Sequence, residues 1–255
     1  MKKNYIQKNI IPGCEEITLK GNKIGCILVH GFRSCPFEMK EYADYFHKEG
    51  FTVKTCLLPG HGTEPPDLLN IKWHDWVNSV NQSFESLRNQ CDRIFISGLS
   101  TGGSLALYLA TEQKNIDGII ALAPGLFLQR RSAWLAHILK YFWKFKKIKS
   151  DPDISIPVKS IVYPKVPVRI ISELLKLFNA LNKRLNDIEV PVLIVYSPKD
   201  HVVKQKSSIK IYNKISSSQK KLIRLKKSFH ILTLDVERNI VFKESVDFIK
   251  DVLSS

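Results

Sequence analysis

The chain has 255 residues, a length that suits one large domain or one domain carrying an insertion. Hydrophobic residues make up 44% of the chain and charged residues 25%, which excludes a disordered chain and is typical of a globular core. The formal net charge of +15 fits an anionic partner such as a nucleic acid, a membrane or an acidic ligand, but a generally lysine-rich composition explains the charge of the chain as a whole better.

The sequence gives no reason to expect a targeting or membrane-spanning segment. Residues 1–13 are basic but lack the apolar stretch of a signal peptide. No uninterrupted apolar run reaches the roughly 18 residues that a membrane span needs. The cysteines are scattered, odd in number and without a CxxC pair, so we expect reduced thiols in a cytoplasmic protein. They are Cys14, Cys26, Cys35, Cys56 and Cys91.

Short apolar runs alternate with helix-like segments through most of the chain. Strands are expected at 23–31, 93–97, 117–124, 190–197 and 220–226, with a strand followed by a turn at 51–62. Helices are expected at 35–50, 74–90, 100–113, 204–215 and 237–253. Ser34 is a candidate cap for the first of these helices. Such alternation predicts a mostly parallel sheet with helices on both faces.

The alternation breaks between residues 125 and 188. Two amphipathic helices are expected there, at 130–149 and 169–185, separated by an extended stretch that contains four prolines. We interpret 125–188 as a cap, or lid, inserted over the carboxyl ends of the strands. Residues 1–124 and 189–255 would then form the core.

The motif Gly98-Leu99-Ser100-Thr101-Gly102 lies where a predicted strand meets a predicted helix. A G-x-S-x-G pattern in this context is typical of a tight, strained turn that lifts the serine hydroxyl out at the end of a sheet. The backbone N–H of Thr101, at the start of the helix, can then face a developing oxyanion. The pattern predicts Ser100 as a nucleophile.

A serine nucleophile needs a base, and the base needs a carboxylate that orients it. Asp200 follows the apolar run 190–197, and His230 lies in a short loop before the last helix, so both their order and their placement fit. Among the other histidines, His201 adjoins Asp200 too closely to be oriented by it, and His61 could line the site. The second oxyanion donor is expected to be the N–H of Phe32, since Gly31 permits a close backbone approach.

The segments "LVHGF", "LPGHG", "GLSTGG", "SPKD" and "SFH" together resemble the α/β-hydrolase superfamily, and within it the bacterial carboxylesterase and monoacylglycerol lipase group. The resemblance covers nearly the whole chain and is weakest in 125–188, where that group carries its cap. It implies an α/β-hydrolase fold with Ser100 as nucleophile, Asp200 as acid and His230 as base. It also implies that the Phe32 and Thr101 amides form the oxyanion hole.

The resemblance implies a serine hydrolase that cleaves carboxylic esters through an acyl-enzyme, with monoacylglycerols or short-to-medium acyl esters as substrates. Thioester, lysophospholipid or C–C bond hydrolysis on the same triad remains an alternative. A non-catalytic ligand-binding member of the fold is another. No cofactor is expected, and without an HExxH, phosphate-loop or paired-cysteine pattern no metal is expected either.

The cap should select the substrate because it is rich in aromatic and aliphatic side chains. The residues expected to bind substrate are Gly31, His61, Leu126, Phe127 and Trp134. Residues 126–186 hold thirteen Lys and Arg against three acidic residues, so most of the net charge of the chain lies there. This excess suggests peripheral contact with an anionic membrane, with a solvated basic face as the alternative. No nucleic-acid motif is present, and the sequence favours no oligomeric state.

Overall fold

The computed structural model describes residues 9–148, 152–158 and 160–255. Its strands are β1 (Thr18–Leu19), β2 (Ile24–Val29), β3 (Thr52–Cys56), β4 (Arg93–Leu99), β5 (Gly118–Leu122), β6 (Phe145–Lys147), β7 (Lys165–Pro167), β8 (Val192–Tyr196) and β9 (Lys220–Arg224). Its α-helices are α1 (Lys40–Lys48), α2 (Trp73–Arg88), α3 (Thr101–Ala110), α4 (Ala136–Leu139), α5 (Val168–Lys183), α6 (Lys206–Lys214) and α7 (Arg238–Ser254). Residues 1–8 of the basic N-terminus, and Lys149 at the end of the predicted helix 130–149, lie outside the described residues.

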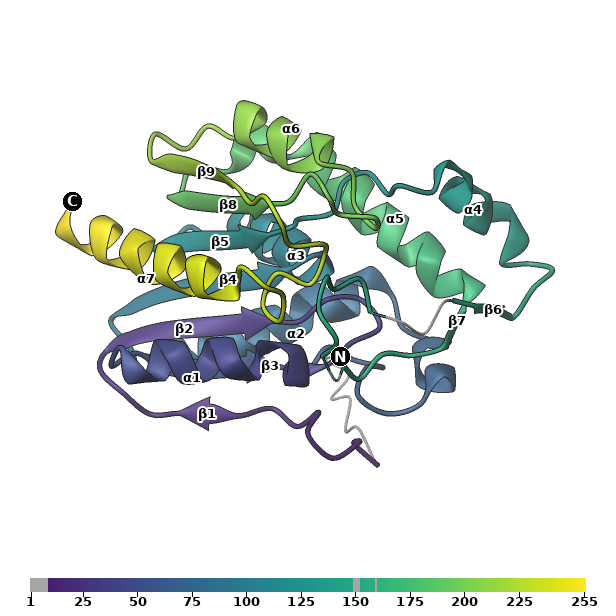
Figure 1. Cartoon of the computed structure of the whole chain (residues 1–255), viewed down its shortest axis with the longest axis horizontal. Coiled ribbons are helices and arrows are strands. Elements are labelled where there is room, and N and C mark those ends of the chain that lie inside the picture. Colours follow the sequence, from purple (N-terminus) through teal and green to yellow (C-terminus); the bar gives the residue numbers. More distant parts are fainter. Residues whose placement is uncertain (1–8, 149–151, 159) are drawn as a thin grey trace.

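Seven strands form one sheet in the order β1-β3-β2-β4-β5-β8-β9 (Figure 1). All neighbours pair in parallel except β1, which pairs antiparallel with β3 at the edge. The expected parallel sheet is therefore confirmed. The edge strand β1 was not expected, because its two residues are too few to show a periodic pattern.

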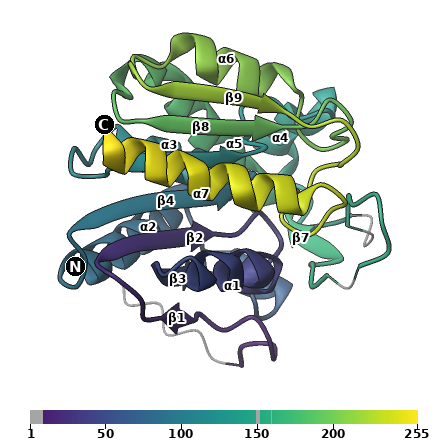
Figure 2. The same ribbon diagram turned by 60° about the vertical axis from the view of Figure 1, so that its left-hand side comes forward.

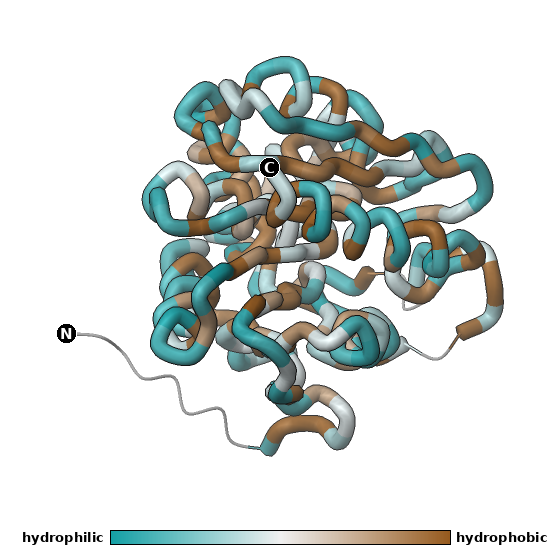
Figure 3. Tube along the Cα trace, turned by 90° about the vertical axis from the view of Figure 1, so that its left-hand side faces the viewer, coloured by the Kyte–Doolittle hydropathy of each residue, from teal (hydrophilic) through white to brown (hydrophobic). Residues whose placement is uncertain are grey.

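Helices cover both faces of the sheet (Figure 2). Alternate strand residues point to opposite faces, so Ile94 and Ile96 join one apolar cluster while Phe95 joins the other. The first cluster includes buried side chains of α2, α3, α5 and α6, and the second includes those of α1 and α7. Figure 3 shows the apolar residues gathered along the central strands. Two packed layers thus hold the carboxyl ends of the strands in a fixed array.

The described part of 125–188 from α4 to the start of α5 lies beyond the carboxyl ends of the central strands, whereas α5 then runs back beside α3, where Arg184 donates to the Thr111 carbonyl (Figure 1). Residues 125–188 contain α4, the antiparallel pair of β6 with β7, and α5, which packs against α2, α3 and α4. The predicted helix 169–185 corresponds to α5. The single helix predicted over 130–149 is wrong: a 3-10 helix, Arg131–Leu135, leads into the one-turn α4, and β6 follows.

This helix is short because its apolar stripe has little to pack against. Of the four residues of α4, only Ala136 is buried. Tyr141 and Phe142, just beyond it, are 78% and 76% exposed. Helices in water depend mainly on tertiary burial of one face, so the helical hydrogen bonding ends where the contacts end.

The prediction of five reduced cysteines is wrong for two of them. Cys14 and Cys35 form a disulfide, whereas Cys26, Cys56 and Cys91 are buried free thiols. The N-terminal segment runs beside the loop after β3, where Ile11 N–H donates to the Gly62 carbonyl, and this places Cys14 next to Cys35. Cys35, rather than Ser34, precedes the 3-10 helix Pro36–Met39 that leads into α1. Spacing alone could not reveal a pairing across 21 residues.

Candidate active site

Ser100 occupies the turn between β4 and α3 with φ +55°, a conformation that non-glycine residues rarely adopt. The flanking glycines make that turn sterically feasible. A Cβ at Gly98 would lie 2.2 Å from the Gly102 carbonyl carbon, and a Cβ at Gly102 would lie 2.2 Å from the Val29 carbonyl oxygen. The Ser100 N–H donates to the Leu122 carbonyl at 2.7 Å, which ties the turn to β5.

The structure brings Ser100, His230 and Asp200 together in one hydrogen-bonded chain. Ser100 Oγ lies 2.9 Å from His230 Nε2, and His230 Nδ1 lies 2.6 Å from Asp200 Oδ2. The other oxygen of Asp200 accepts the Val202 and Val203 N–H groups at 2.7 and 2.8 Å. Because a carboxylate only accepts, His230 carries its proton on Nδ1 and leaves Nε2 free to accept the serine proton.

All three side chains are buried, with 5 to 7% of each residue exposed. Burial by itself lowers the pKa of His230, but the Asp200 carboxylate opposes it through its charge and its hydrogen bond. Asp153 and Glu38 add further negative charge, so the pKa of His230 is raised above its ordinary value. This arrangement stabilises the imidazolium that forms when His230 takes a proton.

Phe32 and Thr101 line the same cavity as Ser100. Across the described residues, neither of their backbone N–H groups donates to a protein acceptor. The peptide that carries the Phe32 N–H is held from behind, because the Gly31 carbonyl lies 2.8 Å from His30 Nδ1. His30 Nε2 accepts the Leu58 N–H at 3.1 Å, so the ring must be protonated on Nδ1 and donates to Gly31. Burial lowers the pKa of His30 well below its ordinary value, which keeps the ring neutral in this role.

Glu38 is a site residue that the sequence analysis missed. It is 2% exposed and lines the cavity, and its carboxyl accepts the Gly31 N–H. Burial raises the pKa of Glu38, although the Gly31 and Ser34 hydrogen bonds and the charge of His230 act in the opposite direction. It lies near the start of the predicted helix 35–50, where no sequence pattern marked it as a site residue.

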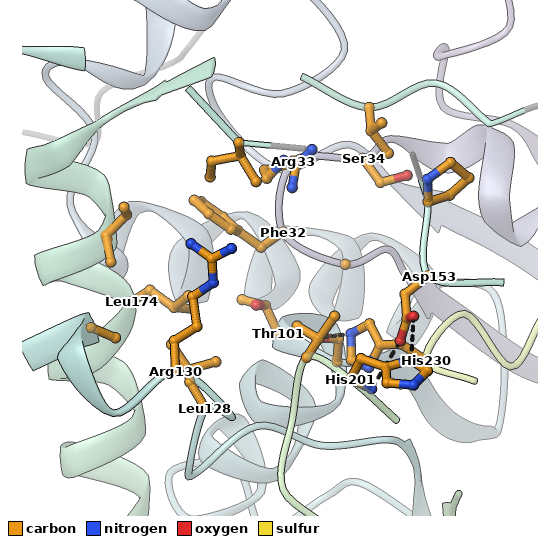
Figure 4. A pocket seen from close by; sticks show the side chains of 18 of the residues that line it. Phe32, Arg33, Ser34, Thr101, Leu128, Arg130, Asp153, Leu174, His201 and His230 are labelled. Carbon is orange, nitrogen blue, oxygen red and sulfur yellow. Dashed lines mark hydrogen bonds and ion pairs between the residues drawn. The ribbon is translucent and has the colours of Figure 1, made fainter. Parts of the chain in front are cut away.

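Ser100 and His230 line a cavity of about 700 Å³. One wall of the cavity is an apolar face of α5, formed by Val168, Ile171, Leu174 and Phe178. Figure 4 shows Leu174, Phe32 and Thr101 around this space, with His230 at one side. The volume is in the range of small-molecule sites, which are mostly apolar with a few polar groups that orient the ligand.

Comparison with known proteins shows the family of this chain. A family model described as serine aminopeptidase, S33 (Hydrolase_4), matches residues 22–237. The chain belongs to this hydrolase family. It is 33% identical over 245 residues to a thermostable monoacylglycerol lipase of Bacillus sp. (strain H-257), covering 95% of this chain and 96% of that protein. It is 26% identical over 234 residues to a carboxylesterase of Bacillus subtilis (strain 168), covering 91% and 95%.

A solved structure from work on two metagenome-derived lipolytic enzymes, LipS and LipT, superposes on this hydrolase with a TM-score of 0.91. It is 30% identical in sequence, and the match covers 95% of this chain and 100% of that one. The predicted α/β-hydrolase fold is confirmed.

The predicted substrate-binding residues of this hydrolase separate into two groups. Gly31 lines the cavity, whereas Leu126, Phe127, Trp134 and His61 are absent from the described lining. Leu126 packs into the core under α5, and Phe127 lies beneath Lys206 and Lys210, whose Nζ atoms are 4.4 and 5.2 Å from its ring centroid. The Phe127 backbone is bonded to Ser207 and Lys204, at the start of α6, and the two side chains lie away from the described lining. Their contact with a substrate stays a prediction.

Trp134 and His61 miss the cavity for different reasons. Trp134 belongs to the 3-10 helix that replaces the predicted longer helix, and it is 59% exposed. His61 is fully buried behind Phe32, with ring centroids 5.9 Å apart. Burial lowers the pKa of His61 to about 4, so the ring is neutral and supports Phe32 from outside the cavity.

Three cationic side chains that the sequence analysis did not assign to the site also line the cavity: Arg33, Arg130 and Lys146. Figure 4 shows Arg130 extending into the space toward Phe32. No group of three or more His, Cys, Asp or Glu side chains that could hold a metal ion occurs within the described part of the chain. Nor does any helix there have the length and apolarity to cross a membrane.

Proposed function

We propose that this carboxylester hydrolase uses Ser100, His230 and Asp200 to cleave esters of a single acyl chain, with monoacylglycerols as the leading substrate class. The observation that carries the proposal is the hydrogen-bonded chain from Ser100 Oγ through His230 to Asp200, of which Ser100 and His230 line a mostly apolar cavity. The 33% identity to a monoacylglycerol lipase supports the choice of substrate.

In the proposed mechanism, Ser100 Oγ attacks the ester carbonyl carbon while its proton moves to His230 Nε2. The N–H groups of Phe32 and Thr101 hold the oxyanion of the tetrahedral intermediate. The C–O bond then breaks, and the alcohol leaves with the proton from Nε2. Water attacks the acyl-enzyme, gives one proton to His230 and releases the acid as Ser100 recovers its hydroxyl. No cofactor takes part in these steps.

We further propose that residues 125–188 act as a cap that selects the acyl chain, over a core of residues 1–124 and 189–255. Helix α4 and the β6–β7 pair lie beyond the strand ends, and α5 supplies one apolar wall of the cavity. A cavity lined mainly by aliphatic and aromatic side chains fits an acyl chain through the hydrophobic effect.

The test is hydrolysis of p-nitrophenyl esters from acetate to palmitate, and of monoacylglycerols, by the wild type and by Ser100→Ala. Removing a triad nucleophile is expected to lower kcat by about 10⁴-fold or more, with residual activity left by the oxyanion hole. Full activity in Ser100→Ala would overturn the assignment of the nucleophile. An inactive wild type would instead favour a thioester, a C–C bond or a non-catalytic ligand.

A second candidate, lysophospholipid hydrolysis, is favoured by the charges in the cavity. Arg130 and Lys146 line it and make no ion pair with any described residue. The carboxyls there are engaged: Glu38 by the Gly31 N–H and Asp153 by His201. A phosphate head group would suit the Arg130 guanidinium. Under this candidate, Arg130→Gln lowers kcat/KM for a monoacyl glycerophosphate more than for the matching monoacylglycerol. An equal effect on both would reject it.

We also propose that the cap contacts an anionic membrane surface. Large side chains around α4 are exposed: Trp134, Ile138, Tyr141, Phe142 and Trp143. Lysines lie among them in the chain, a combination typical of proteins that bind membrane interfaces. Trp143 also lines the cavity, which would join such a surface to the entrance. Co-sedimentation with vesicles should rise with the anionic lipid fraction and fall with salt. Binding insensitive to both would contradict the contact.

A cytoplasmic location is the last part of the proposal. The three free thiols fit a reducing compartment, whereas the Cys14–Cys35 disulfide is more typical of an oxidising one. Alkylation of the protein in acid-quenched cells, followed by mass spectrometry, separates these cases. Alkylation of all five cysteines would mean that the disulfide is reduced in the cell, as a cytoplasmic location requires. Alkylation of only three, with Cys14 and Cys35 protected, would contradict that location.

A further inference from the structure

Asp153, a residue of the 125–188 segment, contacts both loops that carry the acid and the base. Its carboxylate accepts the His201 backbone N–H at 3.0 Å and lies 2.8 Å from His201 Nδ1. The Asp153 backbone carbonyl accepts the His230 N–H at 3.0 Å and the Ile231 N–H at 3.2 Å. One residue therefore bridges the loop after β8 and the loop after β9.

The bridged positions adjoin the atoms that set the triad geometry. His201 follows Asp200 directly, and the same short loop supplies the Val202 and Val203 N–H groups that hold the Asp200 carboxylate. On the other loop, the bond from Asp153 is to the backbone of His230 itself. Figure 4 shows Asp153 between His201 and His230 at one side of the cavity.

The contact differs from an ordinary surface ion pair. The Asp153 side chain is 18% exposed and lines the cavity, whereas the His201 side chain is 64% exposed. Exposed pairs contribute little to stability, so the pairing with the His201 ring alone would matter little. The backbone N–H of His201, which the carboxylate accepts, and the negative charge near His230 are what distinguish this carboxylate.

We propose that Asp153 is a positioning residue of the catalytic machinery, which holds the acid loop and the base loop in register and stabilises the charged form of His230. The inference rests on the proposed triad. It gives the inserted segment a second role besides selecting substrate, because the same segment sets the distance between Asp200 and His230.

Three carboxyl groups act on His230, and each comes from a different part of the chain. Asp200 lies on the loop after β8, Asp153 on the 125–188 segment and Glu38 on the 3-10 helix before α1. Removing the charge of Asp153 leaves the other two in place and should lower the pKa of His230. Since the base must be neutral to accept a proton, the acidic limb of the activity profile should then move to lower pH.

The experiment compares Asp153→Ala and Asp153→Asn with Glu189→Gln, which removes an exposed charge from a pair with Lys114. Asp153→Ala should lower kcat for a soluble p-nitrophenyl ester by about 5- to 20-fold, with little change in KM. Asp153→Asn should lose less, because its amide oxygen can still accept the His201 N–H. Both Asp153 variants should move the acidic limb of the pH–activity profile to lower pH, whereas Glu189→Gln should change neither kcat nor the position of that limb.

The pKa of His230 is also followed by NMR of ¹³C-labelled histidine in the intact protein, a readout that needs no substrate. A lower pKa in both Asp153 variants is expected. An unchanged pKa and acidic limb would overturn the inference, even if the melting temperature fell. If the wild type hydrolyses no ester but the Asp153 variants show the expected lower pKa of His230, the proposed function is refuted and the positioning role of Asp153 still holds.

Discussion

The turn around Ser100 and the segment around α4 lie on opposite sides of the same cavity and obey different rules. At the turn, backbone atoms approach so closely that two glycines have no substitute. Around α4, large apolar side chains are exposed and the helix is one turn long. Backbone geometry determines the first region, so a five-residue motif was enough to predict it. Long-range packing determines the second, and helical periodicity gave the wrong element there.

The largest expected effect tests the claim about the turn. Gly98→Ala should destabilise the fold by more than about 4 kcal/mol, because the new Cβ meets backbone that cannot move aside. Gly125→Ala, at the start of the 125–188 segment, is the matched variant. Its Cβ meets the Phe178 ring, a side chain that can shift, so a cost of about 1–3 kcal/mol is expected. Thermal unfolding followed by circular dichroism measures both, and equal losses would remove the contrast.

The next effect concerns the carboxylate that orients His230. Asp200→Asn should lower kcat by about 10³- to 10⁴-fold, because an amide in that place favours the wrong tautomer. In the wild type the raised pKa of His230 should place the acidic limb of kcat/KM above the ordinary value of about 6.5. Asp247→Asn, which removes an exposed carboxylate paired with Lys243, is the control and should leave kcat and the limb in place. An acidic limb whose apparent pKa is at or below the ordinary histidine value would count against His230 as a base oriented by Asp200.

A smaller effect is expected beneath the oxyanion loop. Glu38→Ala leaves the buried Gly31 N–H without an acceptor, which costs about 1–3 kcal/mol and should lower kcat by roughly tenfold. Glu38→Gln keeps an acceptor, so most of the activity should remain.

The pKa of Glu38 also makes stability depend on pH. Because burial raises this pKa, ionisation of Glu38 opposes folding. The free energy of unfolding of the wild type should therefore fall as the pH rises from the ordinary pKa of a glutamate to the raised pKa of Glu38. The melting temperature of Glu38→Gln should fall less from acidic to neutral pH than that of the wild type. Equal falls in the two proteins would contradict this prediction.

The smallest expected effect concerns the cap, and it tests whether side chains of α5 select the length of the acyl chain. Leu174→Trp should narrow the cavity and shorten the preferred acyl chain, lowering kcat/KM for palmitate about tenfold relative to acetate. Phe127→Leu is the control, because Phe127 lies off the cavity although the sequence pattern indicated substrate contact. A changed chain-length profile in Phe127→Leu would restore the original interpretation of that residue.

The parts predictable from the sequence were those governed by local rules. Strand and helix periodicity gave the sheet and the helices that flank it, and the motif with its flanking elements placed Ser100. Asp200 and His230 were predicted from their positions after late strands, and the structure places both within hydrogen-bonding distance of their partners.

Contacts between residues far apart in the chain could not be predicted, because no local sequence pattern indicates them. Glu38 reaches Gly31 only because the 3-10 helix turns back under the loop, and Asp153 meets His201 across 48 positions. The Cys14–Cys35 disulfide also depends on a fold that spacing does not show. The cap residues Leu126, Phe127 and Trp134 were chosen because they are apolar, a property that core, surface and cavity residues share.

The most direct test of the central claim is to label the nucleophile covalently as its phosphonyl ester. The wild type and Ser100→Ala are each incubated with a long-chain fluorophosphonate, digested and mapped by mass spectrometry. A single adduct on Ser100, formed with a rate that rises as His230 loses its proton and absent from Ser100→Ala, is the result that this account predicts. An adduct on another residue, or equal labelling of Ser100→Ala, would contradict it.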